Sequence, residues 1–568
     1  MDLFTGAPSL HQALVASGLL SADALAAALA EQRTSGKRLV EVLLSRGLVA
    51  ERPLMQALAE MLGLELVSLA GEEVPSAVLG KVPSELALSR QVLPVSADVT
   101  TLTVAVADPL DLATQDDLQM LTGLAIRPVL ATPSEIRRAT ERFYMARMLQ
   151  DAEADETQEG RGGDEALDVA DLQKMAQEEL IIQLVNLLIN QAIQDRASDI
   201  HIEPFERELR VRYRIDGILH EASSPPKRLH PAIVSRIKIL SDMDIAERRL
   251  PQDGRMRIQS AGRQIDLRVS TVPSLYGESV VMRILDRSAA VLSLEEIGMR
   301  SDALSRFRSL IRSPHGIILV TGPTGSGKTT TLYSGLTEIY SEERKIITIE
   351  DPVEYRLHGI TQIQVHPQIG LTFAGGLRSI VRQDPDVIMV GEIRDGETAD
   401  IAIHAALTGH LVLSTLHTND AAGAVSRLLD MGAEPFLVAS SLIGSLAQRL
   451  VRVICPACRV PVPEGHEMWS QAALFGGELA RGPLYYGPGC VECRGLGYRG
   501  RTGIFELLPV DEEVHQMIMR HASAGEIRAH AMRHGMTTLL GDARRKVLAG
   551  ETPVSELLRV CQRESDSD

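Results

Sequence analysis

The segment 322–329 carries the residue types that bind phosphate groups. It follows an apolar run at 316–320, and Leu332 and Leu336 after it lie at helical spacing, so the sequence predicts a strand, a loop and a helix. Glycines in such a loop let backbone N–H groups point at phosphates, and the helix N-terminus adds partial positive charge. A glycine-rich turn without a ligand is the alternative, which the flanking strand and helix disfavour. The predicted nucleotide-binding residues here are Gly322, Pro323, Thr324, Gly325, Ser326, Gly327, Lys328, Thr329 and Thr330.

Lys328 and Thr329 have the most specific predicted roles in this loop. A lysine at this position reaches the β- and γ-phosphates of ATP, and the hydroxyl that follows it ligates Mg²⁺. Hydrolysis also needs a group that positions or polarises water. Glu392 is the catalytic candidate, because it follows an apolar run at 387–390. Gly391 stands where such a strand usually ends in an acidic Mg²⁺ ligand, so the pattern is an altered Walker B motif.

Two further apolar runs, 345–349 and 411–415, also end in polar residues. Ligands of open parallel sheets bind at the carboxyl ends of the strands. Glu350 and Glu354 follow the first run and are candidates to assist with Mg²⁺ and water. Helix-start or turn chemistry is the alternative explanation for both. His417 follows the second run and is the fourth polar group expected at this edge.

Phosphoryl transfer also requires positive charge near the phosphate oxygens. Arg378 and Arg382 lie four positions apart, on one face of a predicted helix. Arg268 and Arg283 lie on the polar faces of predicted strands that precede the loop. An arginine on its own is most often a solvated surface charge, which is the alternative for all four.

Four of the five cysteines form two pairs with metal-ligand spacing. Two residues separate Cys455 from Cys458 and Cys490 from Cys493, and 31 residues lie between the pairs. Each pair can form a tight turn, and four thiolates match tetrahedral Zn²⁺. A redox-active pair is the alternative, and the presence of two pairs favours zinc. Cys561 is alone and has no predicted role.

Composition excludes several classes of protein. The chain has 568 residues with 58 Lys and Arg against 75 Asp and Glu, a net charge of −17, which argues against a general nucleic-acid binder. Aromatic residues are only 3%, so stacking platforms for single strands are not expected. No apolar run reaches the ~18 residues of a membrane helix, and the start lacks the pattern of a signal peptide. We therefore expect a protein of the cytoplasm with reduced thiols.

The sequence predicts a multidomain α/β protein. Apolar residues and a glycine recur 29 positions apart over 9–62, and alternation over 92–106 with a helix start at 132–135 predicts an α/β part at 63–148. Nine acidic residues face one Arg161 in 151–171, which predicts a flexible linker, with an acidic binding segment as the alternative. The predicted domains are 1–150 (N-terminal domain), 172–290 (α+β, with an apolar helix at 180–193 and a strand at 209–215) and 291–568 (P-loop domain, with a zinc subdomain at about 452–502).

Together these motifs resemble the cytoplasmic secretion ATPases of the bacterial type II secretion system, the general secretory pathway E family, within a superfamily that includes type IV pilus motors. The resemblance covers about 5–550. It implies a RecA-like ATPase domain preceded by an α+β (PAS-like) domain. It also implies that His417 contacts the γ-phosphate region, and that Arg268 and Arg283 reach the nucleotide when domains close. The most specific segments are 249–255, 266–271, 277–283, the P-loop, 349–354, 382–386 and 408–417.

The resemblance also implies partners. Members of the family form homo-hexamers whose ATP hydrolysis drives pseudopilus assembly and protein export across the outer membrane. They associate peripherally with the inner membrane. The N-terminal domain would dock on the cytoplasmic domain of the inner-membrane L component. The inner-membrane platform F component and acidic phospholipid are further expected partners. A type IV pilus assembly (extension) ATPase is the alternative, and a nucleotide-sensing scaffold with little turnover is another, because the Walker B acid is missing.

The 29-residue repeat resembles a module that binds cyclic di-GMP in some relatives. Repeats of those relatives begin Arg-Leu-Gly, whereas the copies here begin Ser9-Leu10-His11 and Arg38-Leu39-Val40. One arginine and both glycines of that pattern are absent, so close approach of the backbone to a dinucleotide is not supported. Docking to a membrane partner is the preferred role of this module.

Overall fold

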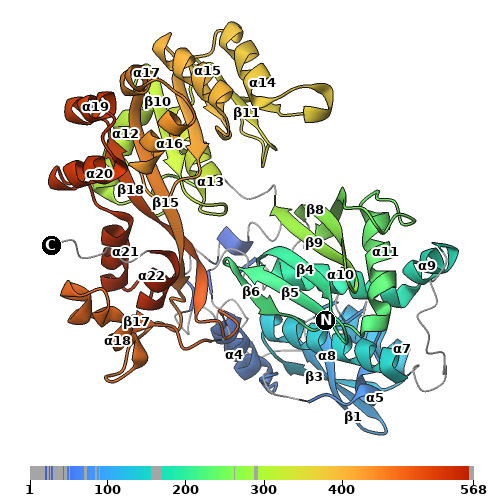
Figure 1. Cartoon of the computed structure of the whole chain (residues 1–568). Helices are drawn as coiled ribbons and strands as arrows, with labels where there is room; N and C mark the ends of the chain where they lie inside the picture. The colour runs from blue at the N-terminus through green and yellow to red at the C-terminus, as the bar shows by residue number, and fades with distance from the viewer. Residues whose placement is uncertain are drawn as a thin grey trace. The chain divides into compact units, whose positions relative to one another are not determined.

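The computed structural model describes residues 51–154 and 169–561 apart from 70–72, 84–85, 88–89, 110, 261–262, 287–291 and 491, and before these only 19–21, 25, 27–29, 42–43 and 48–49. The chain divides into two compact units (Figure 1). The first unit comprises Met1–Arg214, Leu219–Met256 and Leu267–Ile284. The second comprises Ile215–Ile218, Arg257–Asp266 and Leu285–Asp568. The finer division predicted at 150 and 172 stays a prediction.

A three-stranded sheet forms the early part of the first unit. β1 (Val92–Ala97) pairs antiparallel with β2 (Thr101–Val106), which pairs parallel with β3 (Ala125–Leu130). α7 (Leu112–Thr122) joins β2 to β3, and α8 (Pro133–Ala154) follows β3. The hydroxyl of Thr132 accepts a hydrogen bond from the backbone N–H of Glu135 at 3.2 Å, as at many helix starts. The predicted alternation over 92–106 and the predicted helix start at 132–135 are therefore both observed.

Part of the 29-residue repeat is described. Leu25, Leu43, Leu54 and Leu58 are buried in one apolar cluster with residues of the three-stranded sheet. α4 (Glu51–Leu62) is the last helix of the second copy, and α5 (Ser76–Leu79) follows it. Residues 9–18, including the start of the first copy, and Arg38, Leu39 and Val40 lie outside the described residues, as do residues 155–168 of the predicted linker.

A six-stranded sheet in the order β6-β5-β4-β9-β8-β7 lies mainly in the first unit. α10 (Glu179–Gln194) matches the apolar helix predicted from 180, and buries Leu184 and Leu188. It follows α9 (Val169–Ala176). The strand predicted at 209–215 is β5. The other bounds are β4 (Ala197–Pro204), β5 (Leu209–Ile215), β6 (Ile218–Glu221), α11 (His230–Leu240), β7 (Gln252–Ser260), β8 (Arg263–Ser274) and β9 (Gly277–Asp286).

The second unit is built on a seven-stranded sheet in the order β12-β11-β13-β14-β10-β15-β18. Its first six strands are parallel, and β18 pairs antiparallel with β15. The parallel strands predicted at 316–320, 345–349, 387–390 and 411–415 are all present. Their bounds are β10 (Gly316–Thr321), β11 (Ile346–Glu350), β12 (Thr361–Gln364), β13 (Val387–Val390), β14 (Leu411–Leu416), β15 (Leu442–Ile454) and β18 (Tyr498–Pro509).

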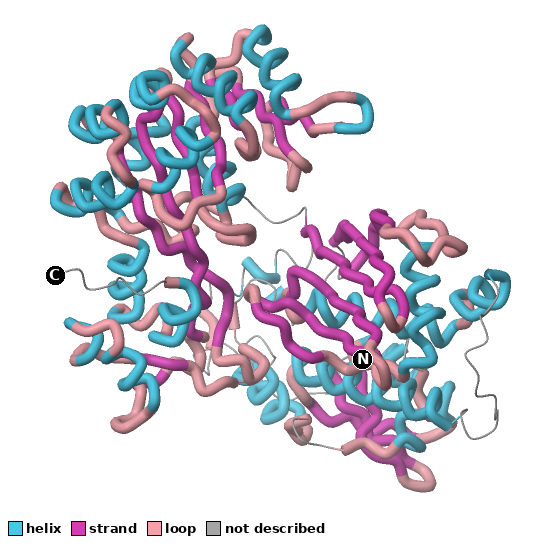
Figure 2. Tube along the Cα trace, in the orientation of Figure 1, coloured by secondary structure: helices cyan, strands magenta, loops and turns pink. Residues whose placement is uncertain are grey.

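Helices cover both faces of this sheet (Figure 2). Because side chains alternate along a strand, Ile317 and Leu319 of β10 join one apolar cluster, and Ile318 and Val320 join the other. α12 (Ser301–Ile311) and α13 (Lys328–Ile339) contribute to the second cluster. The first takes residues from α14 (Phe373–Ile380), α15 (Gly396–Leu407), α16 (Gly423–Asp430), α17 (Pro435–Ser441), α19 (Glu512–Met519) and α20 (Ala524–Arg533).

A third apolar cluster of the second unit lies around the far ends of β15 and β18. Val451 of β15 and Ile504 of β18 pack there with α18 (Glu467–Ala473), α21 (Leu539–Leu548) and α22 (Val554–Val560). The first cysteine pair follows β15 directly, and the second pair shortly precedes β18. Among the helices of the described residues, none has both the length and the apolar character that crossing a bilayer requires.

Candidate nucleotide site and four-cysteine cluster

The predicted phosphate loop joins the carboxyl end of β10 to the start of α13. Gly322, Gly325 and Gly327 all have positive φ values, of 144°, 78° and 89°. A side chain at Gly322 would press on the carbonyl oxygen of Gln448, which a Cβ would approach to 2.5 Å. The backbone path of this loop therefore requires glycine, and backbone N–H groups at the start of α13 face the loop as in an anion site.

Lys328, the first residue of α13, folds back over the loop. Its Nζ donates hydrogen bonds to the carbonyl oxygens of Gly322 at 2.8 Å and Pro323 at 3.1 Å. Burial lowers the pKa of Lys328, although the negative charge of Glu392 opposes that shift. The ammonium group is thus held beside the loop and close enough to Glu392 to interact with its charge.

Gln448 of β15 supports the loop from the neighbouring strand. Its side-chain oxygen accepts a hydrogen bond of 2.6 Å from the hydroxyl of Thr331 in α13, and Gln448 is only 2% exposed. A Cβ at Gly327 would lie 2.8 Å from its Nε2 atom. β15 therefore fixes the loop and the first turn of α13 through one buried amide.

Glu392 and His417 meet at the carboxyl edges of two adjacent strands. Glu392 follows β13 and His417 follows β14, and these strands pair in parallel. Nε2 of His417 lies 3.6 Å from Oε2 of Glu392, while Arg394 donates to the other carboxylate oxygen. Burial and the positive charge of Lys328 lower the pKa of His417, against the influence of Glu392. A pocket lined by Glu392, Arg394, His417 and Arg427 opens beside the imidazole.

Gly391, at the usual acidic position, lies close against the end of β11. A Cβ at Gly391 would lie 3.3 Å from the Cα of Glu350 and 3.3 Å from the carbonyl oxygen of Ile349. The backbone N–H of Gly391 also donates to that carbonyl at 2.8 Å. A side chain at this position would therefore require the backbone at the end of β11 to shift slightly.

Glu350 ends β11 with its carboxylate inside the protein. It is 3% exposed and accepts hydrogen bonds from Tyr333, from Thr348 at 2.6 Å and from Gln362 at 3.1 Å. These donors engage both of its oxygens. The half-buried Glu354 lies in the loop that follows β11, and its backbone N–H interacts with the hydroxyl of Tyr333. The hydrogen-bond partners of the Glu350 carboxylate are thus residues other than Lys328 and Glu392.

Two of the four candidate arginines, Arg378 and Arg382, have contacts with residues other than Lys328, Glu392 and His417. Arg378 of α14 forms an ion pair of 2.6 Å with Glu397, and Arg382 donates to the carbonyl oxygen of Arg378 at 2.9 Å. The two were expected on one helix, but α14 ends at Ile380 and Arg382 lies in a 3₁₀ turn. The residues that follow, Asp384 in a left-handed conformation and then a proline, are incompatible with a continued helix.

Arg268 and Arg283 belong to the first unit, in β8 and β9. Nε of Arg283 lies 3.0 Å from a carboxylate oxygen of Asp199 in β4, and the Arg283 side chain is 60% exposed. The guanidinium of Arg283 is therefore paired within its own sheet and at the same time accessible from outside it.

The four paired cysteines come together as the spacing predicts. Their sulfur atoms all lie within 4.8 Å of one another, with 3.8 Å between Cys455 and Cys490, 3.8 Å between Cys458 and Cys493, and 3.6 Å between Cys490 and Cys493. Sulfur ligands of tetrahedral Zn²⁺ are about 3.8 Å apart at the usual Zn–S length. Burial raises the pKa of Cys455 and Cys458, whereas N–H groups of Cys490 and Gly497 lower that of Cys493 to about 7, so the fit to a metal rests on the sulfur geometry. The cluster therefore fits a tetrahedral thiolate site.

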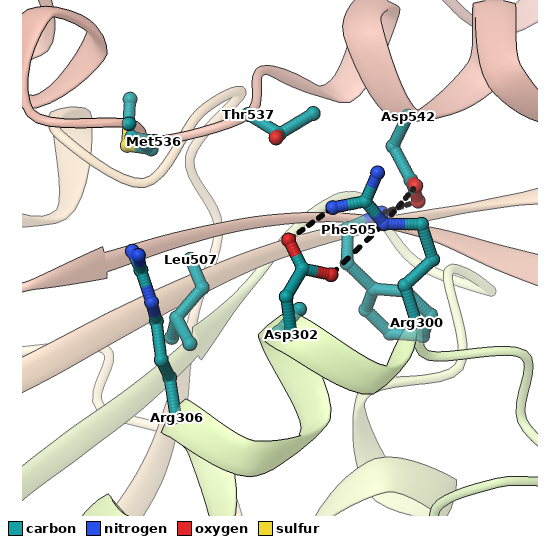
Figure 3. Close-up of a pocket in the computed structure, with 10 residues that line it drawn as sticks. Arg300, Asp302, Arg306, Phe505, Leu507, Met536, Thr537 and Asp542 are labelled. Carbon is teal, nitrogen blue, oxygen red and sulfur yellow. Dashed lines mark hydrogen bonds and ion pairs between the residues drawn. The ribbon is translucent and has the colours of Figure 1, made fainter.

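A separate pocket lies beside α12 and β18. Figure 3 shows Arg300 directed between Asp302 and Asp542, with Arg306 on the other side of the pocket. Nε of Arg300 lies 3.0 Å from Oδ1 of Asp302 and 3.8 Å from Oδ1 of Asp542. Because two carboxylates compensate this guanidinium, we assign the pocket a structural role rather than an anion-binding one.

Three residues of the site were not assigned a role from the sequence. Arg394 pairs with Glu392, Gln448 supports the loop, and Arg449 is near enough to Lys328 to influence its pKa and donates to Asn419 at 3.0 Å. The sequence shows that Arg394 follows the altered Walker B strand. Nothing local shows that β15, which carries Gln448 and Arg449, lies next to β10.

Comparisons with known proteins identify the family of this chain. The family model "Type II/IV secretion system protein" matches residues 174–559, and an "MshEN domain" model matches residues 62–149. The chain is 44% identical over 557 residues to the type IV pilus assembly ATPase PilB of Myxococcus xanthus, covering 97% of this chain and 98% of that protein. It is 47% identical over 552 residues to the type II secretion system protein E of Xanthomonas campestris pv. campestris, covering 94% of each.

A third relative, the type II secretion system ATPase E of Vibrio cholerae, is 53% identical over 384 residues, which are 67% of this chain and 75% of that protein. The seven-stranded α/β sheet and the loop between β10 and α13 place the chain among the nucleotide-binding α/β proteins. It belongs to the type II/IV secretion system protein family, as a secretion ATPase of the type II E group. The resemblance inferred from the motifs is thereby confirmed, and the scaffold alternative without turnover is not supported.

Proposed function

We propose that this ATPase is the motor of a type II secretion system, converting ATP hydrolysis into pseudopilus assembly and export of proteins across the outer membrane. The grouping of Lys328, Glu392 and His417 at the carboxyl edges of β10, β13 and β14 carries the proposal. A cation, a carboxylate and an imidazole grouped in this way would suit the γ-phosphate and the attacking water of an ATP bound by the loop. Relatives named for type II secretion support the pathway.

In the proposed reaction, the loop 322–329 and Thr330 hold the phosphates, and Lys328 leaves its carbonyl partners to contact the β- and γ-phosphates. Glu392 orients the attacking water and accepts its proton, and His417 donates to a γ-phosphate oxygen. Thr329 would hold Mg²⁺, which neutralises charge on the phosphates. Glu350 and Glu354 act indirectly, by shaping the end of β11. Arg378 and Arg382, and by resemblance Arg268 and Arg283, supply further positive charge toward the nucleotide.

Several finer features belong to the same proposal. The second unit carries a RecA-like domain whose cysteine subdomain is held by one structural Zn²⁺ on Cys455, Cys458, Cys490 and Cys493, and the first unit carries the PAS-like domain. The motor acts as a homo-hexamer at the cytoplasmic face of the inner membrane. It docks there through its N-terminal domain on the L component and contacts the platform F component and acidic phospholipid. The MshEN match keeps cyclic di-GMP as a candidate ligand of this domain.

Deletion of the gene, with complementation, tests the pathway. We expect the deletion strain to retain type II substrates in the periplasm and the wild-type gene to restore their export. The Lys328→Ala variant should fail to restore it. Normal export by the deletion strain would refute the secretion role.

Type IV pilus assembly is the second candidate, because the match to PilB of Myxococcus xanthus covers 98% of that protein. The same deletion strain separates the two functions. Loss of surface pili and of pilus-dependent motility, with export intact, would establish pilus assembly in place of secretion.

A further inference from the structure

Two helices of the second unit bring two histidines and a glutamate together. Glu513 lies on α19, and His530 and His534 lie four residues apart at the end of α20, hence on one face of that helix. One ring nitrogen of each histidine and a carboxylate oxygen of Glu513 all lie within 4.8 Å of one another. This group is separate from the cysteine cluster and takes no part in the nucleotide site.

His530 is a buried imidazole between two carboxylates. It is 3% exposed, its Nδ1 lies 3.7 Å from Oε2 of Glu513, and its Nε2 lies 3.6 Å from Oδ2 of Asp511. Within the described part of the chain, Nε2 has no hydrogen-bond partner. Asp511 is the group nearest to Nε2 in these contacts, and a buried imidazole between two carboxylates is costly unless a cation or a proton is shared among the three groups.

His534 is oriented as histidine ligands of metals usually are. Its Nδ1 lies 3.0 Å from the carbonyl oxygen of His530, and the two rings are 4.2 Å apart between centroids. A proton on Nδ1 completes that hydrogen bond and leaves the lone pair of the ring on Nε2. Metal-binding histidines commonly fix their tautomer in this way, by donating the other ring N–H to a carbonyl or a carboxylate.

Asp511 provides the corresponding support for His530. Its Oδ1 caps α19 by accepting from the N–H of Val514 at 2.8 Å, which leaves Oδ2 toward Nε2 of His530. A proton on Nε2 then faces Asp511, and Nδ1 faces Glu513. His530 therefore lies between Asp511, which would support it, and Glu513, which would bind the metal with it.

We propose that Glu513, His530 and His534 form a second metal site, which binds a divalent transition-metal ion of the zinc class through two imidazoles and one carboxylate. Imidazole and carboxylate donors suit Zn²⁺, Co²⁺ and Ni²⁺, whereas Mg²⁺ and Ca²⁺ prefer oxygen donors alone. Nitrogen and oxygen ligands of tetrahedral Zn²⁺ are about 3.3 Å apart. Glu513 can close the remaining gap by rotation, because its side chain is 67% exposed. A bound ion would fasten α19 to α20.

Titration of the full-length protein with Co²⁺ tests the site. The protein is used as purified, with its cysteine cluster intact, and binding is followed by calorimetry and by visible absorption. We expect one equivalent of Co²⁺ to bind with ligand-field bands but without a sulfur-to-metal charge-transfer band, since no thiolate takes part. His534→Ala and Glu513→Gln should each weaken binding by at least ~10-fold. Asp511→Asn, which preserves the helix cap, should also weaken it by about 10-fold or more.

Matched variants control for surface effects. His404→Ala removes an exposed histidine of α15, and Glu512→Gln changes the exposed neighbour of Glu513, so both should bind Co²⁺ as the wild type does. As a second readout, Zn²⁺ should slow hydrogen exchange in α19 and α20 of the wild type but not of His534→Ala. Unchanged affinity in both ligand variants, absence of binding by the wild type, or a charge-transfer band that reports thiolate coordination would each overturn the proposal.

Discussion

Nε2 of His417 lies 3.6 Å from Oε2 of Glu392, across the ends of two paired strands. Arg394 donates to the other oxygen of the same carboxylate. Glu392 is thus held at both oxygens, and its side chain is only 17% exposed. A carboxylate fixed in this manner can orient a water molecule with little loss of conformational entropy, provided that ATP binding releases one of the two contacts. The first two predictions examine this group.

Lys328→Ala should abolish hydrolysis. The substitution removes a charge that contacts the phosphates more strongly in the transition state than in free ATP, so we expect kcat/KM to fall by at least ~10²-fold. Steady-state phosphate release measures it. Lys345→Ala is the control, because the exposed Lys345 precedes β11 at the opposite edge of the sheet and should leave the rate unchanged. Near-normal turnover by Lys328→Ala would contradict the proposed site.

Glu392→Gln should separate binding from hydrolysis. The amide keeps the shape of the side chain but cannot accept a proton, so we expect near-normal affinity for a fluorescent ATP analogue and a kcat lowered by about 10²-fold or more. Glu350→Gln is the comparison variant. The carboxylate of Glu350 accepts hydrogen bonds from Tyr333, Thr348 and Gln362, so this substitution should lower the free energy of unfolding more than it lowers kcat. If Glu392→Gln hydrolyses normally while Glu350→Gln does not, the catalytic role belongs to Glu350.

Cys490→Ser should lower zinc content and stability together. Three thiolates and a hydroxyl hold Zn²⁺ more weakly than four thiolates, and structural zinc sites contribute directly to folding. To exclude the proposed Glu513–His530–His534 site, elemental analysis uses freshly purified protein carrying His534→Ala, which should hold about one Zn²⁺ per chain, and well under half of that when Cys490→Ser is added. Cys561→Ser should keep the full content. Equal zinc in wild type and Cys490→Ser would refute the assignment.

Glu556→Gln should destabilise the end of the second unit. The buried carboxylate accepts bonds from Arg452 at 2.8, 3.0 and 2.8 Å and from Arg559 at 2.9 and 2.6 Å. Removing its charge leaves Arg452 partly buried without its counterion, a change that costs about 3–5 kcal/mol in comparable pairs. Hydrogen exchange of α22 measures the loss, and Glu464→Gln, at an exposed position of the same unit, is the control.

The same carboxylate predicts a pH dependence. Burial would raise the pKa of Glu556, but hydrogen bonds from Arg559 and Arg452 outweigh burial and lower it. A lowered pKa means that the stabilisation is complete above the ordinary glutamate value of 4.5 and is lost as the pH falls through the lowered pKa. Thermal unfolding in acid should therefore show a steeper loss of stability in the wild type than in Glu556→Gln.

Arg283→Ala tests the role that the resemblance gives to the arginines of the first unit. If the guanidinium acts on the nucleotide, kcat should fall much more than ATP affinity, and the unfolding temperature should be unchanged. Asp199→Asn removes the charge that pairs with Arg283 at 3.0 Å and with Arg214 at 3.6 Å but keeps both arginines, so it reports the effect of losing these ion pairs. Arg210→Ala is a surface control on β5. Equal effects of Arg283→Ala and Asp199→Asn on kcat would assign Arg283 a structural role. Arg268→Ala is tested in the same way and compared with the same control variants.

Local patterns identified most of the candidate site. The strand, loop and helix around Lys328 and the two cysteine pairs are contiguous in sequence, so residue type and spacing are sufficient to predict them. The direction of the Glu350 carboxylate was not predictable. It depends on which face of β11 meets α13, and Tyr333 occupies that face. The role of Gln448 could not be predicted, because it is 117 residues from Thr331 in the sequence. The two residues meet only because β15 pairs with β10.

The long strand β15 connects the phosphate loop to the four-cysteine cluster. Gln448 in its middle holds the first turn of α13, and Cys455 follows its end, after a register shift between Arg452 and Ile454. At roughly 3.3 Å per residue, the two residues are about 23 Å apart along one extended backbone. A residue that stabilises the phosphate loop and a cysteine of the cluster therefore belong to one continuous strand and its immediate end.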